Sequence, residues 1–152
     1  MALKYMHIGF DDTDSPRGGC TTYIAALLVE KLEKLGAKFT DYPNLVRLNP
    51  NVPWKTRGNG ALCLRIKCDE NIMDEIKETV IETVEENSDL IYEGTDPGIV
   101  FLSRAKVPKE IRAFAKNAIT AGVPARPSGK TRCRTSNPRT ATLCRCMTRW
   151  PT

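Results

Sequence analysis

The sequence predicts an α/β fold, close to the border with α+β, in which a mixed sheet carries helices packed mainly on one face. Segments with the two-residue alternation of a strand are interleaved with segments that have the three-to-four-residue spacing of an amphipathic helix. Hydrophobic residues make up 41% of the 152 residues, which is enough for the core of one small domain.

The first elements are a strand and a helix. Residues 4–10, KYMHIGF, form a short apolar run typical of a buried strand. In residues 21–35, apolar side chains such as Ile24 and Leu28 recur at helical spacing. Gly36 then ends the predicted helix.

The later elements continue the alternation of strand and helix. They are two short extended pieces that each end in proline, an alternating strand, a helix with an acidic outer face, an apolar strand and a helix with proline in its first turn: residues 37–43, 44–50, 61–68, 70–86, 98–103 and 108–120. This succession is expected to place the helices against one sheet.

Composition divides the chain into a body, residues 1–120, and a tail, residues 121–152. The body has a net charge of −2, whereas the tail has seven basic residues and no acidic one. The tail also lacks an apolar period, so we expect it to be disordered, or to result from a shift of reading frame. The alternative is a functional basic arm that binds nucleic acid.

The longest purely apolar run, residues 23–29, is too short to cross a bilayer. No charged-then-apolar signal segment precedes the first strand. We therefore expect a cytoplasmic protein with no membrane partner. Nothing in the sequence pattern indicates its oligomeric state.

An acidic loop, residues 11–20, follows the first strand, and two glycines in it precede the helix. Asp11, Asp12 and Asp14 supply the carboxylates. Backbone N–H groups at a helix start, with glycines before it, bind phosphate, and the predicted contacts are Gly18, Gly19, Cys20, Thr21 and Thr22. Carboxylates and phosphates share a site when a hard dication lies between them, so the pattern indicates Mg²⁺ with a nucleotide.

The alternative interpretation of the acidic loop is a polar turn stabilised by Asx caps. Such turns are common, but three carboxylates directly after a buried strand repel one another. This repulsion favours the metal site over the plain turn.

A second polar loop lies at residues 47–61, RLNPNVPWKTRGNGA. It combines cations, amides and glycines that could clamp phosphate, namely Arg47, Asn49, Lys55, Arg57, Gly58, Asn59 and Gly60. Taken alone, the same run is equally consistent with a surface hairpin.

Two motifs together, GFDDTDSPRGGCTTYIAALL and LVRLNPNVPWKTRGNGA, resemble the N-terminal region of the archaeal isoleucine-tRNA agmatidine synthetases. The resemblance extends from about His7 to Asn117. It implies a kinase-like domain with the start of a ferredoxin-like region. It also implies that Asp11, Asp12 and Asp14 hold Mg²⁺, and that the catalytic residues are Thr21, Asp11, Asp12, Lys55 and Arg57.

The resemblance implies an ATP-dependent ligase that forms a C–N bond between agmatine and the wobble cytidine of an isoleucine tRNA. ATP would phosphorylate the 2-carbonyl oxygen of the cytosine, and the amine would displace phosphate; Thr21 would also take phosphate. Members of the family are about three times this length and continue through an OB-fold and a zinc ribbon. We therefore expect a truncated ATP-binding fragment; the alternative is a non-enzymatic nucleic-acid binder that uses the basic tail.

Overall fold

The computed structural model describes residues 3–51, 55 and 58–120. Its strands are β1 (Lys4–Asp11), β2 (Lys38–Phe39), β3 (Asn44–Arg47), β4 (Gly60–Cys68) and β5 (Gly98–Leu102). Its helices are α1 (Thr21–Lys34), α2 (Met73–Asn87), which a 3-10 turn η1 (Glu70–Ile72) precedes, and α3 (Lys109–Thr120). Each element predicted from the sequence is therefore present, with bounds that differ by at most a few residues. The tail, residues 121–152, lies outside the described residues, so the division of the chain into body and tail stays a prediction.

The described strands form one sheet in the order β2-β4-β1-β5, and β3 pairs with the same strand, β4, as β2 does. The α/β fold class is confirmed, but every described strand pair is antiparallel, so the sheet is not the mixed one we expected. Helix α1 connects β1 to β2, which runs in the same direction, and β4 lies between these two strands in the sheet. Helix α2 likewise connects β4 to β5, and β1 lies between them. This is the split β-α-β topology of ferredoxin-like folds.

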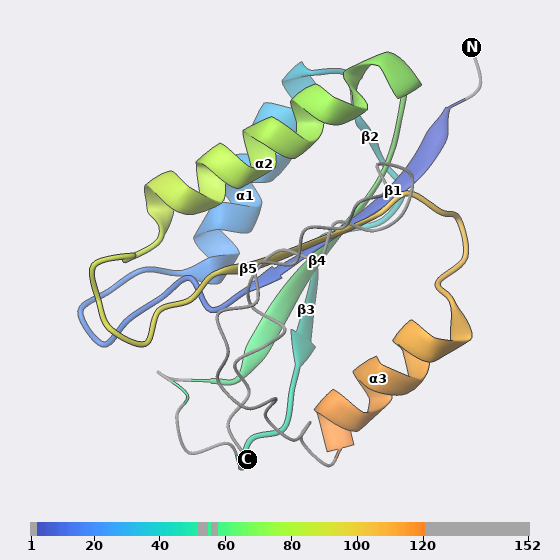
Figure 1. Cartoon of the computed structure of the whole chain (residues 1–152). Coiled ribbons are helices and arrows are strands. Elements are labelled where there is room, and N and C mark those ends of the chain that lie inside the picture. Colours follow the sequence, from blue (N-terminus) through green and yellow to red (C-terminus); the bar gives the residue numbers. More distant parts are fainter. Residues whose placement is uncertain (1–2, 52–54, 56–57, 121–152) are drawn as a thin grey trace.

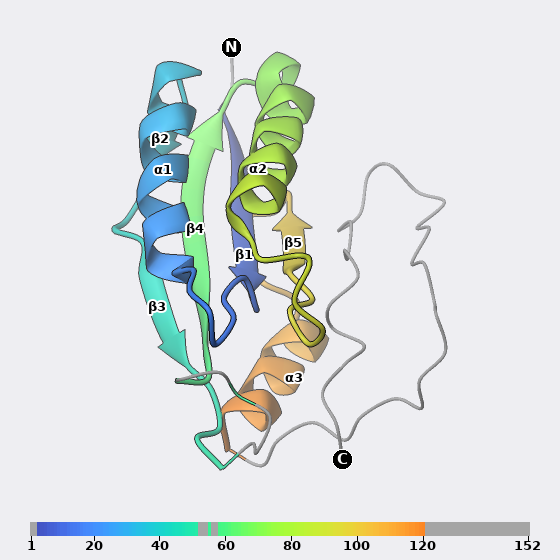
Figure 2. The same ribbon diagram turned by 90° about the vertical axis from the view of Figure 1, so that its left-hand side faces the viewer.

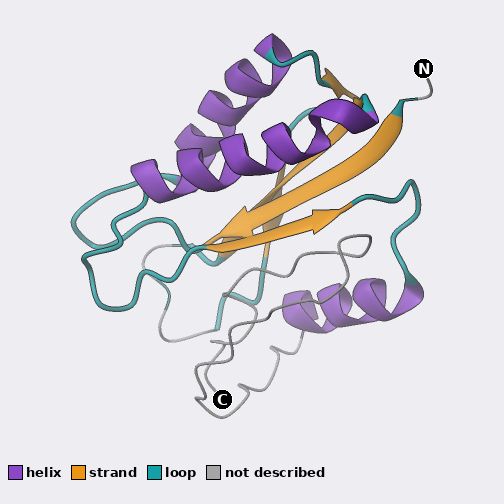
Figure 3. Cartoon of the chain, turned by 45° about the horizontal axis from the view of Figure 1, so that its top comes forward, coloured by secondary structure: helices purple, strands orange, loops and turns teal. Residues whose placement is uncertain are grey.

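Helices α1 and α2 cover one face of the sheet, and α3 lies on its other side (Figures 1 and 3). Figure 2 shows α1 and α2 side by side over β4 and β1. The fully buried side chains between these layers come from alternate positions of the central strands and from one stripe of each helix: Met6, Ile8, Leu64, Ile66, Ile24, Leu28, Leu32, Ile76, Val80 and Val84. None of the side chains of α3 is buried.

The edge beside β4 is interrupted between β2 and β3. Pro43 precedes β3 and cannot donate a hydrogen bond to a sheet ladder. Phe39 pairs with Ile66 and Asn44 pairs with Cys63. Residues 40–43 therefore lie opposite only residues 64–65 of β4, which makes a bulge at this edge. After this bulge the chain pairs with β4 again as β3. Arg47, the last residue of β3, then lies opposite Gly60, the first residue of β4.

Ile66→Val is expected to lower the free energy of unfolding by about 1 kcal/mol, because it removes one methyl group from a fully buried position of β4. Urea titration followed by circular dichroism would measure this. Ile91→Val is the matched control, since Ile91 is 89% exposed, and it should stay within about 0.5 kcal/mol of the wild type. Equal losses in the two variants would contradict the core assignment.

No helix in the described part of the chain is both long and apolar enough to span a membrane.

Candidate nucleotide site

A pocket of about 230 Å³ lies where the start of α1 meets the ends of β3 and β4. Eight of its lining residues belong to the two motifs found in the sequence, although these motifs are separated along the chain. The pocket is lined by Asp14, Cys20, Thr21, Thr22, Leu45, Arg47, Gly58, Gly60 and Leu62. The fold therefore brings the acidic loop and the second polar loop to one cavity.

The first turn of α1 forms one wall of this pocket. Cys20 is the N-cap residue, and its side chain makes no capping hydrogen bond to the first turn. The first turn also contains no acidic side chain that would neutralise the positive end of the helix dipole. Both features leave the tip of α1 suited to an anion, as the sequence predicts for Cys20, Thr21 and Thr22.

Thr21 forms a hydrogen bond with Thr13 of the acidic loop. The hydroxyl of Thr13, which is fully buried, donates to Oγ1 of Thr21 across 2.9 Å. This contact links the acidic loop to the helix tip and fixes one side of the Thr21 hydroxyl. Sequence reasoning did not identify Thr13 as a site residue, although it lies within the acidic motif.

Arg47 supplies positive charge on the opposite wall. A Cβ atom placed on Gly58 would be 2.5 Å from Nη1 of Arg47, so the guanidinium lies directly against the glycine backbone. Gly60, which pairs with Arg47 across the sheet, also lines the pocket. An arginine in this place can bind phosphate oxygens through its fork of N–H groups.

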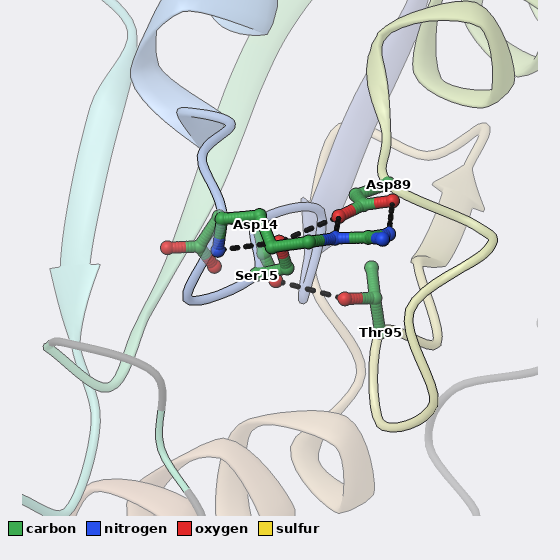
Figure 4. Close-up of polar contacts among 5 residues, drawn as sticks. Asp14, Ser15, Asp89 and Thr95 are labelled. Carbon is green, nitrogen blue, oxygen red and sulfur yellow. Dashed lines mark hydrogen bonds and ion pairs between the residues drawn. The ribbon is translucent and has the colours of Figure 1, made fainter.

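The three aspartates lie in different surroundings. Asp11 ends β1, and its burial, followed by the charge of Asp12, raises its pKa from 3.8 to about 7. Asp12 has a positive φ of 54°, and its Oδ2 accepts a hydrogen bond of 3.1 Å from the backbone N–H of Asp96. The side chain of Asp14 lines the pocket, and in Figure 4 its carboxylate points away from Asp89 and Thr95.

These carboxylates suit a magnesium ion that also binds a substrate. Asp11 and Asp12 are adjacent in the chain, and the charge of Asp12 contributes to the raised pKa of Asp11, so a dication would relieve their repulsion. Among the described residues, no group of three or more His, Cys, Asp or Glu side chains is arranged to hold a metal by itself. One or two carboxylates completed by phosphate oxygens is the ligand set that Mg²⁺ commonly takes.

The two glycines before the helix do not line the pocket but shape the loop around it. Gly19 has a φ of +89°, and a Cβ atom there would be 3.0 Å from the Cα atom of Asp14. Gly18 closes a tight turn through reciprocal backbone hydrogen bonds with Ser15, of 2.8 and 3.1 Å. Their predicted contact with a nucleotide remains a prediction.

The remaining predicted residues lie in the second polar loop. Asn59 donates from its side-chain Nδ2 to the backbone carbonyl of Asn49 across 2.8 Å, and this hydrogen bond closes the base of the loop. The exposed Lys55 contacts the carbonyl of Pro50 through Nζ. Arg57 lies outside the described residues. Asn49, Asn59 and Lys55 therefore belong to the second polar loop, but they do not line the pocket.

A clasp between distant parts of the chain closes the acidic loop from the other side (Figure 4). We define the clasp as Ser15 and Arg17 on the acidic loop with Asp89 and Thr95, which lie between α2 and β5. Ser15 donates to Asp89 across 2.6 Å, Arg17 forms an ion pair with Asp89, and Thr95 donates to the carbonyl of Asp14 across 3.0 Å. Sequence reasoning missed the clasp because its partners are more than 70 residues apart.

Comparison with known proteins gives a consistent family. The family model described as the TiaS TCKD domain matches residues 7–126. The isoleucine-tRNA 2-agmatinylcytidine synthetase TiaS of Pyrococcus horikoshii is 49% identical over 114 residues, which are 75% of this chain and 26% of that protein. The protein of the same name from Methanocaldococcus jannaschii is 50% identical over 106 residues, which are 68% of this chain and 25% of that protein.

Solved structures agree with the sequence relatives. A crystal structure of TiaS in complex with its isoleucine tRNA and ATP has a TM-score of 0.70 and 40% identity, covering 76% of this chain and 27% of that chain. A complex of TiaS with the same tRNA, AMPCPP and agmatine has a TM-score of 0.66 and 37% identity, with the same coverage. This chain spans about a quarter of the length of the curated relatives it matches. The family match and the level of identity together show that the chain belongs to the TiaS TCKD domain family.

Proposed function

We propose that this chain is the ATP-binding and phosphoryl-transferring domain of a cytoplasmic synthetase that joins agmatine to the wobble cytidine of an isoleucine tRNA. Relatives with this name support the reaction, and related structures contain ATP, or AMPCPP with agmatine, together with the isoleucine tRNA. The fragment matched here would supply ATP binding and activation, and the remaining length of such a synthetase would supply further contacts to tRNA.

The observation that carries the proposal is the composition of the pocket. The uncapped tip of α1, the Thr21 and Thr22 side chains, and the guanidinium of Arg47 surround one cavity. These are groups that bind and neutralise phosphate oxygens, and phosphoryl transfer depends chiefly on positioning and charge neutralisation.

The residues of the pocket have separate roles in this proposal. The backbone N–H groups at the helix tip, Thr22 and Arg47 hold the phosphates. Thr21 presents its hydroxyl to the γ-phosphorus; when its oxygen forms the new P–O bond, the bond to the bridging oxygen of ADP breaks. Asp14, which lines the same cavity, is the group in the pocket that can accept the hydroxyl proton. The same phosphate-holding groups would serve transfer to the cytosine oxygen.

Asp11, Asp12 and Asp14 would hold a magnesium ion, together with phosphate oxygens of the nucleotide, and Asp14 would supply the ligand on the side of the pocket. When bound, such an ion would supply positive charge that offsets the charge of the transferred phosphoryl group. The polypeptide contributes the carboxylates, the enclosure of Asp11 and the fixed direction of Asp12, whose Oδ2 accepts the N–H of Asp96.

Arg47→Ala is expected to weaken ATP binding at least about tenfold, because it removes a charge-assisted contact to phosphate. Isothermal titration of the full chain with ATP and MgCl₂ would measure the dissociation constant. Arg65→Ala is the matched control: Arg65 lies on the same sheet, but it contacts Asp41 and does not line the pocket. Absence of ATP binding by the wild type, or equal affinities of wild type and Arg47→Ala, would contradict the proposed function.

A further inference from the structure

The acidic loop carries the phosphate-site residues, but its shape depends on a segment that is remote in sequence. Four contacts come from three residues in the segment 89–96, which lies between α2 and β5. Asp89 binds both Ser15 and Arg17, the hydroxyl of Thr95 donates to the carbonyl of Asp14, and the N–H of Asp96 donates to Oδ2 of Asp12.

The contact made by Thr95 is with Asp14, a residue that lines the pocket. Thr95 is 6% exposed, and its Oγ1 is 3.0 Å from the backbone oxygen of Asp14. Asp14 lines the pocket, and in Figure 4 its carboxylate points away from Thr95. Fixing the carbonyl therefore fixes the backbone from which the pocket-facing carboxylate projects.

We propose that Thr95 is a positioning residue for the nucleotide site, because its buried hydroxyl holds the backbone of Asp14 in the orientation that directs the Asp14 carboxylate into the pocket. This inference rests on the proposed function, since it names a residue that acts on the proposed ATP site through Asp14. Thr95 itself does not line the pocket.

The rest of the clasp shows why Thr95 has a role separate from general stability. Asp89 already fastens the outer turn of the loop through Ser15 and the charged Arg17, which also lies 5.5 Å from the ring centre of Tyr92. Loss of the Thr95 hydroxyl therefore leaves the loop attached. What changes is the part that carries Asp14, whose carbonyl loses a buried donor, and a group left without its partner favours local rearrangement.

Thr95→Val keeps the shape of the side chain and removes its hydroxyl. We expect it to weaken binding of ATP with Mg²⁺ about tenfold, as measured by isothermal titration on the full chain. Thr95→Ser keeps the hydroxyl and should retain the wild-type affinity within about twofold. Thr83→Val is the matched control: Thr83 is fully buried, its Oγ1 accepts from Lys31 between α1 and α2, and it lies outside the pocket.

A double-variant cycle with Asp14→Asn separates positioning from stability. If Thr95 acts through the Asp14 carboxylate, Thr95→Val should weaken affinity much less in the Asp14→Asn background than in the wild type. Full additivity of the two effects would overturn the proposal. So would a Thr95→Val variant that binds ATP as tightly as the wild type, while the wild type itself binds.

A second measurement keeps the inference testable when no ATP is bound. Nitrogen-15 relaxation of the backbone amides in residues 13–21 should show increased motion around Asp14 in Thr95→Val, but not in Thr95→Ser or Thr83→Val. A wild type that fails to bind ATP, with this change in motion present, would remove the proposed function and leave the positioning of Asp14 by Thr95 intact. Unchanged amide motion in Thr95→Val would overturn the positioning itself.

Discussion

Gly19→Ala is expected to lower the free energy of unfolding by about 2–4 kcal/mol and to weaken ATP binding about a hundredfold. Gly19 has a φ of +89°, where a side chain is strained. Its new Cβ atom would lie 3.0 Å from Cα and 3.3 Å from Cβ of Asp14, and 3.3 Å from the carbonyl oxygen of Thr13. Two of these three contacts are with backbone atoms, so the acidic loop itself would have to move away from the helix tip.

Gly36→Ala provides a closely matched control for this prediction. Gly36 has nearly the same φ, +88°, but nothing lies within 4 Å of a Cβ atom placed there. It should therefore lose about 1 kcal/mol from backbone strain alone and keep the wild-type affinity for ATP. Chemical denaturation and isothermal titration of both variants would measure the difference. Equal stabilities and equal affinities of the two variants would show that the contact between Gly19 and Asp14 does not shape the site.

The elements of the fold were predictable because their signals are local. A short apolar run identified β1, alternation identified β4, and helical spacing with a terminal Gly36 identified α1. The antiparallel pairing was not predictable in the same way. An alternating succession of strands and helices is compatible both with neighbouring parallel strands and with an intervening antiparallel strand, and the choice depends on contacts between distant segments.

The site shows the same division between local and distant information. Asp14, Thr21 and Arg47 stand out as polar residues of two motifs that also contain glycines, and the structure places all three around one pocket. Asp89 and Thr95 carry no comparable local signal, since a polar residue near a turn has many ordinary uses. Their contribution arises only when the connection between α2 and β5 lies against the acidic loop.

Asp11→Asn is expected to stabilise the metal-free protein at pH 8 while removing part of its response to ATP and Mg²⁺. Burial and the neighbouring Asp12 raise the pKa of Asp11 from 3.8 to about 7. Between these two pH values the folded protein retains the Asp11 proton and the unfolded chain has lost it. The unfolded state therefore binds fewer protons, and the free energy of unfolding falls as the pH rises from about 4 to about 7.

Above pH 7 this loss is complete and amounts to at most about 4 kcal/mol, because the carboxylate is then charged in both states but buried in only one. The amide of Asp11→Asn carries no charge, so the variant should match the wild type near pH 4 and exceed its stability by a few kcal/mol at pH 8. Urea titrations in EDTA across this range would measure both curves. Asp74→Asn, in which an 88% exposed side chain is changed, should follow the wild-type curve.

Adding ATP and MgCl₂ distinguishes the electrostatic cost of burying Asp11 from its proposed role in binding the metal ion. A ligand that binds the folded state raises the free energy of unfolding, so the wild type should gain more at pH 8 than at pH 5, where Asp11 is protonated. Asp11→Asn should gain less than the wild type at pH 8. Equal gains in the two proteins would exclude Asp11 from the proposed metal site even if the pH dependence without metal agrees. The unfavourable burial of Asp11 is thus understandable as the cost of a carboxylate placed for a cation, a conflict between stability and activity that is common at functional sites.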